Sequence, residues 1–504
     1  MISATHRYTP DNFKNIAISL ACGAITPLGF APHGIYLIPF ISISILILQC
    51  KGSHKKNALL YGFLFGLGYF GYGVNWLHIS INLFGGINLI GAYLITTLLV
   101  LYLSIYPAIF SLLVSILVRN TNFSYSHLLS IPAIWTLGEW IRSWLFTGFP
   151  WLNLGYSQTD SALSDLAPIL GVFGIGFLVV MIAVAIAIIY KSDKKSKAIS
   201  ITLIITVWVS AWFAGNKVWS ENLNQSISVA LIQGAVPQEI KWSPEMRLPT
   251  KQLYQDLTTE NLNADLIIWP EAAIPSYFHQ EQIYLNEIHS MVRANNSILL
   301  TGMPVYDIPS AKFYNGAIYL SDKIEFYFKQ HLVPFGEYLP LKWLLQPIVD
   351  TLNIPIADFS QGLDSSPVLK SDKFNIGITI CYEDTFGNEV IKSLPEANIL
   401  VNISNDAWFG DSLAPHQHLE MARMRAQETG RYLLRATNTG ITAIIDNKGK
   451  ILSRSPQFNE STLSGNANLY AGQTPYSRFG NYPVILFCFI SLISLSRFRK
   501  RKNR

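Results

Sequence analysis

The chain has 504 residues, of which 50% are hydrophobic and only 14% are charged, and its mean hydropathy is +0.29. Because charged residues make up about a quarter of an ordinary soluble domain, this composition excludes a wholly soluble protein and predicts that part of the chain lies in a membrane. The net charge of +5 is small and does not indicate a nucleic-acid partner.

Seven apolar stretches precede residue 216 and predict a transmembrane bundle over residues 1–215. They lie near 15–31, 34–50, 57–79, 88–117, 127–147, 166–190 and 198–215. Most of them reach the ~20 residues that a spanning helix needs, and the first two are short enough to pack as a hairpin. An eighth apolar run, from Pro483 to Leu495, predicts a further helix within residues 481–504.

Lysine and arginine occur in alternate connections of this bundle. Those expected inside contain Arg7, Lys14, Arg119 and the lysine clusters at 51–56 and 191–197. The connections near 31–33, 80–87 and 148–165 contain no lysine or arginine, and the last helix precedes a basic tail. By the positive-inside rule both termini are cytoplasmic and residues 216–480 face the other side.

One pair of charges lies inside an apolar stretch. Glu139 and Arg142 are three residues apart, and charges at membrane depth are candidates for a functional site. We favour a structural pair near the outer interface, although the sequence leaves the role of the pair open.

Residues 216–480 have the composition of a globular domain. Short apolar runs alternate there with helix-like stretches, and the runs begin near 226, 264, 297, 317, 375, 398 and 441. Continuous apolar strands are typical of sheets that are covered on both faces, so we expect a layered α/β domain. The stretch contains no glycine-rich phosphate loop, and we expect no cofactor.

Three apolar runs of this domain deliver chemically active side chains. LIIWP is followed by Glu271, EFYFKQHLVPFGE supplies Lys329 and then Glu337, and ITICYE delivers Cys381. The other three cysteines lie in apolar segments, so Cys381 has no obvious disulfide partner. A thiol, a base and a cation are the groups that acyl transfer through a thioester requires. A buried core cysteine is the alternative that Cys381 by itself leaves open.

Two histidines in PHQH raise the question of a metal. His416 and His418 are two residues apart, so on a helix their side chains point in different directions. Nothing nearby completes a tetrahedral set, and we expect no metal.

Four motifs of residues 216–480 resemble the nitrilase superfamily: WPEAAIP (269–275), KQHLVPFGEYLP (329–340), CYED (381–384) and NISNDAWFG (402–410). The helices, GFPWLNLGYSQ (148–158) and QHLEMARMRA (417–426) resemble more narrowly the bacterial apolipoprotein N-acyltransferases. The resemblance covers nearly the whole chain. It implies an αββα sandwich on the periplasmic face of the bacterial inner membrane, beside eight transmembrane helices.

The resemblance also implies roles for particular residues. Glu271 would be the general base, Lys329 the electrostatic stabiliser and Cys381 the nucleophile. The residues expected to shape or support the site are Glu337, Tyr382, Glu383, Trp242 in KW and Asn315 in YNG. The backbone N–H of Tyr382 could join Lys329 in an oxyanion hole, as the residue after a nucleophile often does.

The implied reaction has two lipidic substrates. The enzyme would take an acyl chain from a phospholipid, typically phosphatidylethanolamine, onto its cysteine and pass it to the α-amino group of the diacylglyceryl-cysteine of an apolipoprotein. This is the last step of lipoprotein maturation, and we expect a monomer. A membrane-tethered amidase that hydrolyses a small amide is the alternative, and a transporter or scaffold with an inactive outside domain is a third. The apolar stretch from Leu339 to Ile356, with Trp343, Leu344 and Leu345, is a candidate membrane-facing arm.

Overall fold

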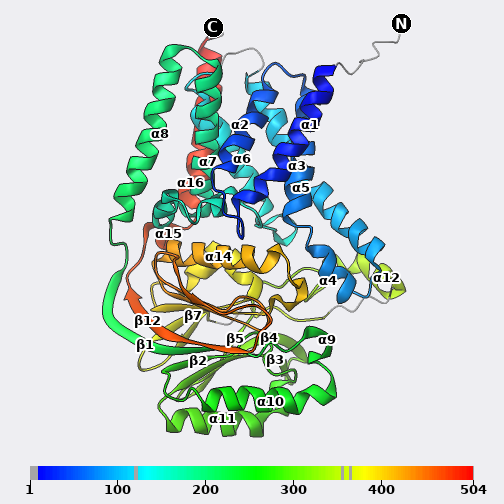
Figure 1. The fold of residues 1–504 in the computed structure, drawn as a ribbon, viewed down its shortest axis with the longest axis vertical. Coiled ribbons are helices and arrows are strands. Elements are labelled where there is room, and N and C mark those ends of the chain that lie inside the picture. The colour runs from blue at the N-terminus through cyan, green and yellow to red at the C-terminus, as the bar shows by residue number, and fades with distance from the viewer. Residues whose placement is uncertain (1–9, 119–122, 353–356, 363–365, 503–504) are drawn as a thin grey trace. The chain divides into compact units, whose positions relative to one another are not determined.

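The computed structural model describes residues 10–118, 123–352, 357–362 and 366–502 of two compact units (Figure 1). The helical unit consists of Met1–His78, Ile90–Lys217 and Asn481–Arg504, and the sheet unit consists of Ile79–Leu89 and Val218–Gly480. The C-terminal helix therefore belongs with the N-terminal bundle. Arg7 and Arg119 of the predicted inside connections, and Ile356 of the predicted arm, lie outside the described residues.

Each predicted apolar segment contains a helix. The helices are α1 (Pro10–Ile25), α2 (Ile38–Cys50), α3 (Lys55–Gly73), α5 (Leu89–Val118), α6 (His127–Arg142), α7 (Ala167–Lys191), α8 (Lys194–Gly215) and α16 (Tyr482–Lys502). Among the described residues three stretches, Leu89–Val118, Ala162–Lys191 and Lys194–Gly215, are long and apolar enough to cross a membrane. Crossing by all eight helices stays a prediction.

Close backbone contact joins α1 to α3. A Cβ atom at Gly23 would overlap the backbone of Phe65, and one at Gly68 would overlap the carbonyl of Leu20. Small residues allow helix backbones to approach in this way, which is how helices associate where the surrounding lipid removes the hydrophobic driving force.

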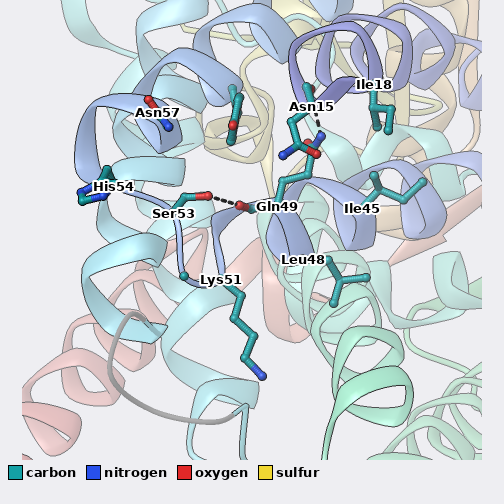
Figure 2. Close-up of a pocket in the computed structure, with 11 residues that line it drawn as sticks. Asn15, Ile18, Ile45, Leu48, Gln49, Lys51, Ser53, His54 and Asn57 are labelled. Carbon is teal, nitrogen blue, oxygen red and sulfur yellow. Dashed lines mark hydrogen bonds between the residues drawn. The ribbon is translucent and has the colours of Figure 1, made fainter. Parts of the chain in front are cut away.

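Polar side chains also join the helix ends around a hollow of about 450 Å³ (Figure 2). Gln49 at the end of α2 donates to the carbonyl of Asn15 on α1 at 2.9 Å and accepts from the hydroxyl of Ser19 at 2.9 Å. The hydroxyl of Ser53 donates to the carbonyl of Gln49 at 2.5 Å. Lys51 also lines the hollow, but its ammonium lies over the ring of Phe123.

The charged pair on α6 is buried and holds the connection that follows it. Arg142 donates to the carbonyls of Phe149 and Trp151 at 2.8 and 2.5 Å and to the side-chain oxygen of Asn153 at 2.6 Å. Glu139 accepts from the backbone N–H of Leu154 at 2.8 Å. These contacts satisfy the backbone of a non-helical segment inside the bundle, which favours the structural role.

The sheet unit contains two six-stranded sheets. In sheet order, the first consists of β12 (Ser461–Ala471), β1 (Glu221–Gln233), β2 (Leu266–Ile268), β3 (Ile298–Asp307), β4 (Lys312–Leu320) and β5 (Ile324–Phe328). The second consists of β11 (Ile451–Arg454), β10 (Ala443–Ile445), β9 (Leu433–Thr437), β8 (Ile399–Ser404), β7 (Asn375–Ile380) and β6 (Val368–Lys370). The central strands β1–β2–β3 and β7–β8–β9 are parallel within each sheet.

Apolar side chains fill the space between the two sheets and cover their outer faces. Leu231 and Ile268 of the first sheet share a core with Ile378 and Ile403 of the second. The helices α10 (Pro244–Thr259) and α11 (Gln282–Ala294) cover the first sheet, and α14 (Leu413–Thr429) covers the second (Figure 1). This αββα arrangement confirms the predicted sandwich and explains why the strands are apolar on both faces.

The α6 contacts give a test of the structural role. Arg142→Met would leave the carbonyls of Phe149 and Trp151 and the carboxylate of Glu139 without their cation, so we expect a loss of about 3–5 kcal/mol in the free energy of unfolding. Thermal unfolding of the purified protein in detergent measures this loss. The exposed Lys55→Met is the control and should change stability by less than ~0.5 kcal/mol. Equal unfolding temperatures for both variants would contradict the assigned role.

Candidate active site

Cys381 begins the turn that follows β7. The strand ends at Ile380, and the next residues form a 3₁₀ turn, Cys381–Thr385. Cys381 has a φ of +52°, in the left-handed region that non-glycine residues rarely adopt. Such a conformation costs about 1–3 kcal/mol and persists only where surrounding contacts enforce it. Its side chain is partly exposed, unlike the buried Cys22, Cys50 and Cys488.

A buried cluster of opposite charges comes from the first sheet. The ammonium of Lys329, directly after β5, lies 2.9 Å from Glu337 Oε1 and 3.5 Å from Glu271 Oε1, and its side chain is only 1% exposed. Asn315 on β4 bridges the two carboxylates, because its Nδ2 donates to Glu271 Oε1 at 2.7 Å and to Glu337 Oε1 at 2.8 Å. The backbone N–H of Val333 donates to the other oxygen of Glu337 at 2.7 Å. The loop that contains Glu337 is thus folded around the cation.

The charges of this cluster act on the thiol. Although Cys381 is partly exposed, the protein packed around its thiol removes water from it, and this desolvation and the carboxylate of Glu271 raise the pKa of Cys381. The nearby Lys329 opposes this effect only in part. Burial alone would lower the pKa of Lys329, but Glu337 and Glu271 outweigh burial and raise that pKa. The thiol is therefore neutral at rest and Lys329 is charged, so the arrangement supplies a cation for a developing oxyanion and a carboxylate for the thiol proton.

Glu383 connects the Cys381–Thr385 turn to the loop after β5. One carboxylate oxygen accepts from the hydroxyl of Tyr327 at 2.9 Å and from the backbone N–H groups of Gln330 and His331 at 2.6 and 3.1 Å. The other accepts from the N–H of Ile380 at 2.7 Å. Burial raises the pKa of Glu383 to about 7, against the lowering effect of these donors and of Lys329. Its contacts brace the backbone on both sides of the site.

The two aromatic residues predicted for the site lie in different surroundings. Tyr382 is buried, and its ring lies against His331 and Phe386. Trp242 follows the short helix α9 (Gln238–Lys241) and is 51% exposed. Among the described residues no hydrogen bond or ring contact joins Trp242 to Glu271, Lys329 or Cys381. The structure therefore brings together Glu271, Lys329, Glu337 and Asn315, with Cys381 and Glu383 on the facing turn.

Lys241 is a charged residue of this region that the sequence analysis did not single out. It is 0% exposed, and its ammonium has no hydrogen-bond partner among the described residues. Burial lowers the pKa of Lys241 to about 8, and Glu271 partly offsets this effect. An uncompensated buried ammonium is costly and is typical of functional sites. The only sequence signal was its position next to Trp242 in KW.

One histidine of PHQH lies between two carboxylates in the protein interior. His418 is buried on α14 with one ring nitrogen 2.9 Å from Asp384 and the other 2.9 Å from Asp406. Among the described residues no group of three or more His, Cys, Asp or Glu side chains is arranged to hold a metal ion.

Both halves of the chain match known families. The sequence model of the apolipoprotein N-acyltransferase N-terminal domain matches residues 22–185, and that of the carbon-nitrogen hydrolases matches residues 228–475. A protein of Methylococcus capsulatus named apolipoprotein N-acyltransferase is 41% identical over 497 residues, which cover 97% of each chain. A protein of the same name from Photobacterium profundum is 39% identical over 97% of this chain and 96% of its own. Another from Coxiella burnetii is 38% identical over 95% of this chain and 99% of its own.

Some solved structures resemble about half of the chain. A nitrilase-superfamily member from Saccharomyces cerevisiae is 17% identical and matches 48% of this chain and 90% of its own, with a TM-score of 0.36. An amidase from Nesterenkonia sp. AN1 is 16% identical and matches 51% of this chain and 98% of its own, also with a TM-score of 0.36.

The burial of Lys241 makes a prediction about stability and pH. The ammonium of Lys241 holds its proton less tightly in the folded state than in the unfolded state. Burial of this charge therefore lowers the free energy of unfolding by its full amount below pH 8, and the loss disappears as the pH rises to the ordinary pKa of 10.5. Lys241→Met should therefore raise the free energy of unfolding near pH 7, by up to roughly 3 kcal/mol, and the gain should vanish near pH 10.5.

Unfolding temperatures of the two proteins at the two pH values measure this gain. The exposed Lys323→Met, in the same unit, is the control and should leave the unfolding temperature unchanged. A Lys241→Met protein that is less stable than the parent at both pH values would contradict the assignment.

Proposed function

The chain belongs to the apolipoprotein N-acyltransferase family, and from that premise we propose that it moves an acyl chain from a membrane phospholipid to an apolipoprotein. The protein is an acyltransferase, and the proposed acceptor is the α-amino group of the diacylglyceryl-cysteine of the apolipoprotein. The observation that carries the proposal for the site is the pairing of Lys329 with Glu271 and Glu337, whose charges act on the thiol of Cys381. The proposed donor is phosphatidylethanolamine.

The first half of the proposed reaction forms a thioester. Glu271 accepts the proton of Cys381, and the thiolate attacks an ester carbonyl of the phospholipid. The ammonium of Lys329 and the backbone N–H of Tyr382 stabilise the oxyanion. When the tetrahedral intermediate collapses, the carbon–oxygen bond breaks and the leaving lysophospholipid takes the proton from Glu271.

The second half transfers the acyl chain to nitrogen. The α-amino group of the apolipoprotein attacks the thioester, and Glu271 accepts the proton that the new amide nitrogen loses. The carbon–sulfur bond breaks, and Cys381 regains its proton from Glu271. Asn315, Glu337 and Glu383 touch the cluster or its backbone and position it, so we assign them supporting roles.

Attachment to the membrane has a physical reason in this proposal. Each buried CH₂ group contributes about 0.8 kcal/mol, so a soluble catalyst would face a prohibitive cost in drawing a long acyl chain out of the bilayer. We propose that the chain is a monomer in the bacterial inner membrane, with its sheet unit in the periplasm and both termini in the cytoplasm. The alternate placement of lysine and arginine in the connections supports this orientation.

We also propose that α12 (Lys342–Leu352) is a membrane-facing arm. Trp343 is 80% exposed, and the apolar side chains of Leu341 and Leu344 are 54% and 50% exposed. An amphipathic helix with exposed aromatic and leucine side chains is typical of segments that lie in the membrane interface. The side chain of Leu345 lies outside the described part of the chain.

The acyl carrier can be trapped. Purified protein incubated with phosphatidylethanolamine labelled in one acyl chain should gain a hydroxylamine-labile label on Cys381, because a thioester is cleaved by hydroxylamine. A diacylated lipopeptide added next should receive the label on its amino group. Cys381→Ala should remove the adduct, whereas Cys22→Ala should keep it, because Cys22 is buried in α1.

The other outcomes distinguish the competing functions. Release of the label only as free fatty acid would support hydrolysis, as in the amidase alternative. Absence of any adduct on the wild-type protein would contradict both enzymatic functions. Labelling that persists in Cys381→Ala would show that the nucleophile is another residue.

The proposed arm predicts that a charge at Trp343 slows the reaction with vesicle phospholipid, whereas a charge elsewhere on the same unit does not. Trp343→Asp should slow acylation of Cys381 by phospholipid in vesicles roughly tenfold, because a charge in the interface weakens membrane contact by more than ~1 kcal/mol. The matched control is Ile283→Asp on α11, since Ile283 is also 80% exposed in the same unit. Unchanged turnover of vesicle lipid by Trp343→Asp, or an equal loss in both variants, would contradict the arm.

A further inference from the structure

Cys381 is held at its carbonyl oxygen by a side chain from the neighbouring strand. Asn402 lies on β8, opposite Thr379 of β7 in the parallel register. Its Nδ2 donates to the carbonyl oxygen of Cys381 at 3.2 Å and to the hydroxyl of Thr379 at 3.0 Å. The amide thus braces the end of β7 on both sides of Ile380, where the chain turns into the left-handed conformation of Cys381.

The orientation of the Asn402 amide is set from the next strand. Asn402 pairs in register with Arg435 of β9, and Arg435 Nη1 donates to Asn402 Oδ1 at 2.5 Å. A guanidinium group only donates hydrogen bonds, so it requires the amide oxygen on its side. The NH₂ group must then face Cys381. Thr379, Asn402 and Arg435 form a row across three parallel strands that ends at the nucleophile.

Arg435 is itself held in a closed network of charges. It donates to Asp384 at 3.1 Å and to Asp406 at 2.9 Å, and His418 joins the same two carboxylates. All four side chains are at most 3% exposed. Two carboxylates balance one guanidinium and one imidazolium, so the buried network is neutral when His418 is protonated. Asp384 belongs to the same turn as Cys381, and the network therefore ties this turn to β9.

The planarity of the peptide bond gives this row a consequence for catalysis. The carbonyl of Cys381 and the N–H of Tyr382 belong to one trans peptide unit, so they point in opposite directions. A contact that holds the carbonyl oxygen also aims the N–H group. That N–H is the donor that the proposed function uses for the oxyanion.

We propose that Asn402 and Arg435 are positioning residues for the acyl transfer. Arg435 orients the amide of Asn402, and this amide holds the carbonyl of Cys381. The nucleophile thereby keeps its left-handed backbone, and the N–H of Tyr382 keeps its direction. This inference rests on the proposed function for its reaction, but the contacts concern the thiol itself and can be tested separately.

The test compares two asparagines that bridge the same pair of strands. Asn402→Ala removes the brace at the nucleophile end. Asn398→Ala removes a bridge at the other end, where Asn398 accepts from the N–H of Asn375 at 3.0 Å. Two rates are measured on the full-length protein: single-turnover formation of the S-acyl adduct from labelled phospholipid, and alkylation of Cys381 by iodoacetamide followed by mass spectrometry. Thermal unfolding records the stability of each variant.

Asn402→Ala should slow formation of the adduct at saturating phospholipid by roughly 10- to 100-fold, because it misplaces the thiol and the oxyanion donor. Alkylation of Cys381 should slow as well. Both rates of Asn398→Ala should stay within about twofold of wild type. This should hold even when the unfolding temperature of Asn398→Ala falls as far as that of Asn402→Ala.

Two further variants separate positioning from folding. Arg435→Lys keeps the charge between the aspartates but loses the planar guanidinium group that orients the amide of Asn402. Because Arg435 acts on the thiol through this amide, the double variant Arg435→Lys/Asn402→Ala should be no slower than Asn402→Ala. Should Asn402→Ala fail to fold, Asn402→Asp keeps the oxygen that accepts from Arg435 and removes the donor to Cys381. The same slowing is expected for it.

A folded Asn402→Ala or Asn402→Asp protein with wild-type rates would overturn the inference. An equal loss in Asn398→Ala would do the same, because the effect would then be one of sheet stability. If the wild-type protein forms no adduct with phospholipid, the proposed function fails, and the alkylation rates still decide whether Asn402 positions the thiol.

Discussion

The buried ammonium of Lys329 is the interaction on which the rest of the site depends. Burying a cation at 1% exposure is costly unless carboxylates compensate its charge, and Glu271 and Glu337 do so at 3.5 and 2.9 Å. Asn315 completes the cluster by donating to both carboxylates. The charge therefore dictates where the ends of β4 and β5 and the loop around Glu337 lie. A carboxylate that could act as a base is held in place by the same cation that would stabilise the oxyanion.

The site forms only because two sheets meet. The cation and its carboxylates come from the first sheet, whereas the thiol stands at the end of β7 in the second. Glu383 joins them, since it accepts from the backbone of Ile380 at the end of β7 and from the backbone of Gln330 and His331 after β5. The apolar core between the sheets sets their separation, and Glu383 sets their alignment at this end. Packing and hydrogen bonding thus act together to bring the electrostatic cluster to the thiol.

The electrostatics favour a thiol that ionises only during the reaction. Burial and Glu271 raise the pKa of Cys381, so the resting group is neutral and weakly nucleophilic. In the proposed reaction a neutral resting thiol is an advantage, because a resting thiolate would react with other electrophiles. Asp406, one of the carboxylates held by Arg435, also raises the pKa of Cys381, so the buried network contributes to keeping the thiol neutral.

Local patterns in the chain predicted the helices, the strands and the chemically active residue types, whereas the contacts between side chains follow from the tertiary structure. Apolar runs predicted the helices and the covered strands, because burial leaves a local pattern, and the motifs singled out Glu271, Lys329 and Cys381. Length and hydropathy support three spanning helices among the described residues, fewer than the eight predicted. No local sequence pattern predicted the left-handed backbone of Cys381, the hydrogen bonds from Asn315 to two carboxylates or the burial of Lys241. The row from Thr379 through Asn402 to Arg435 depends on strand order and register, which are set by contacts between residues far apart in the chain.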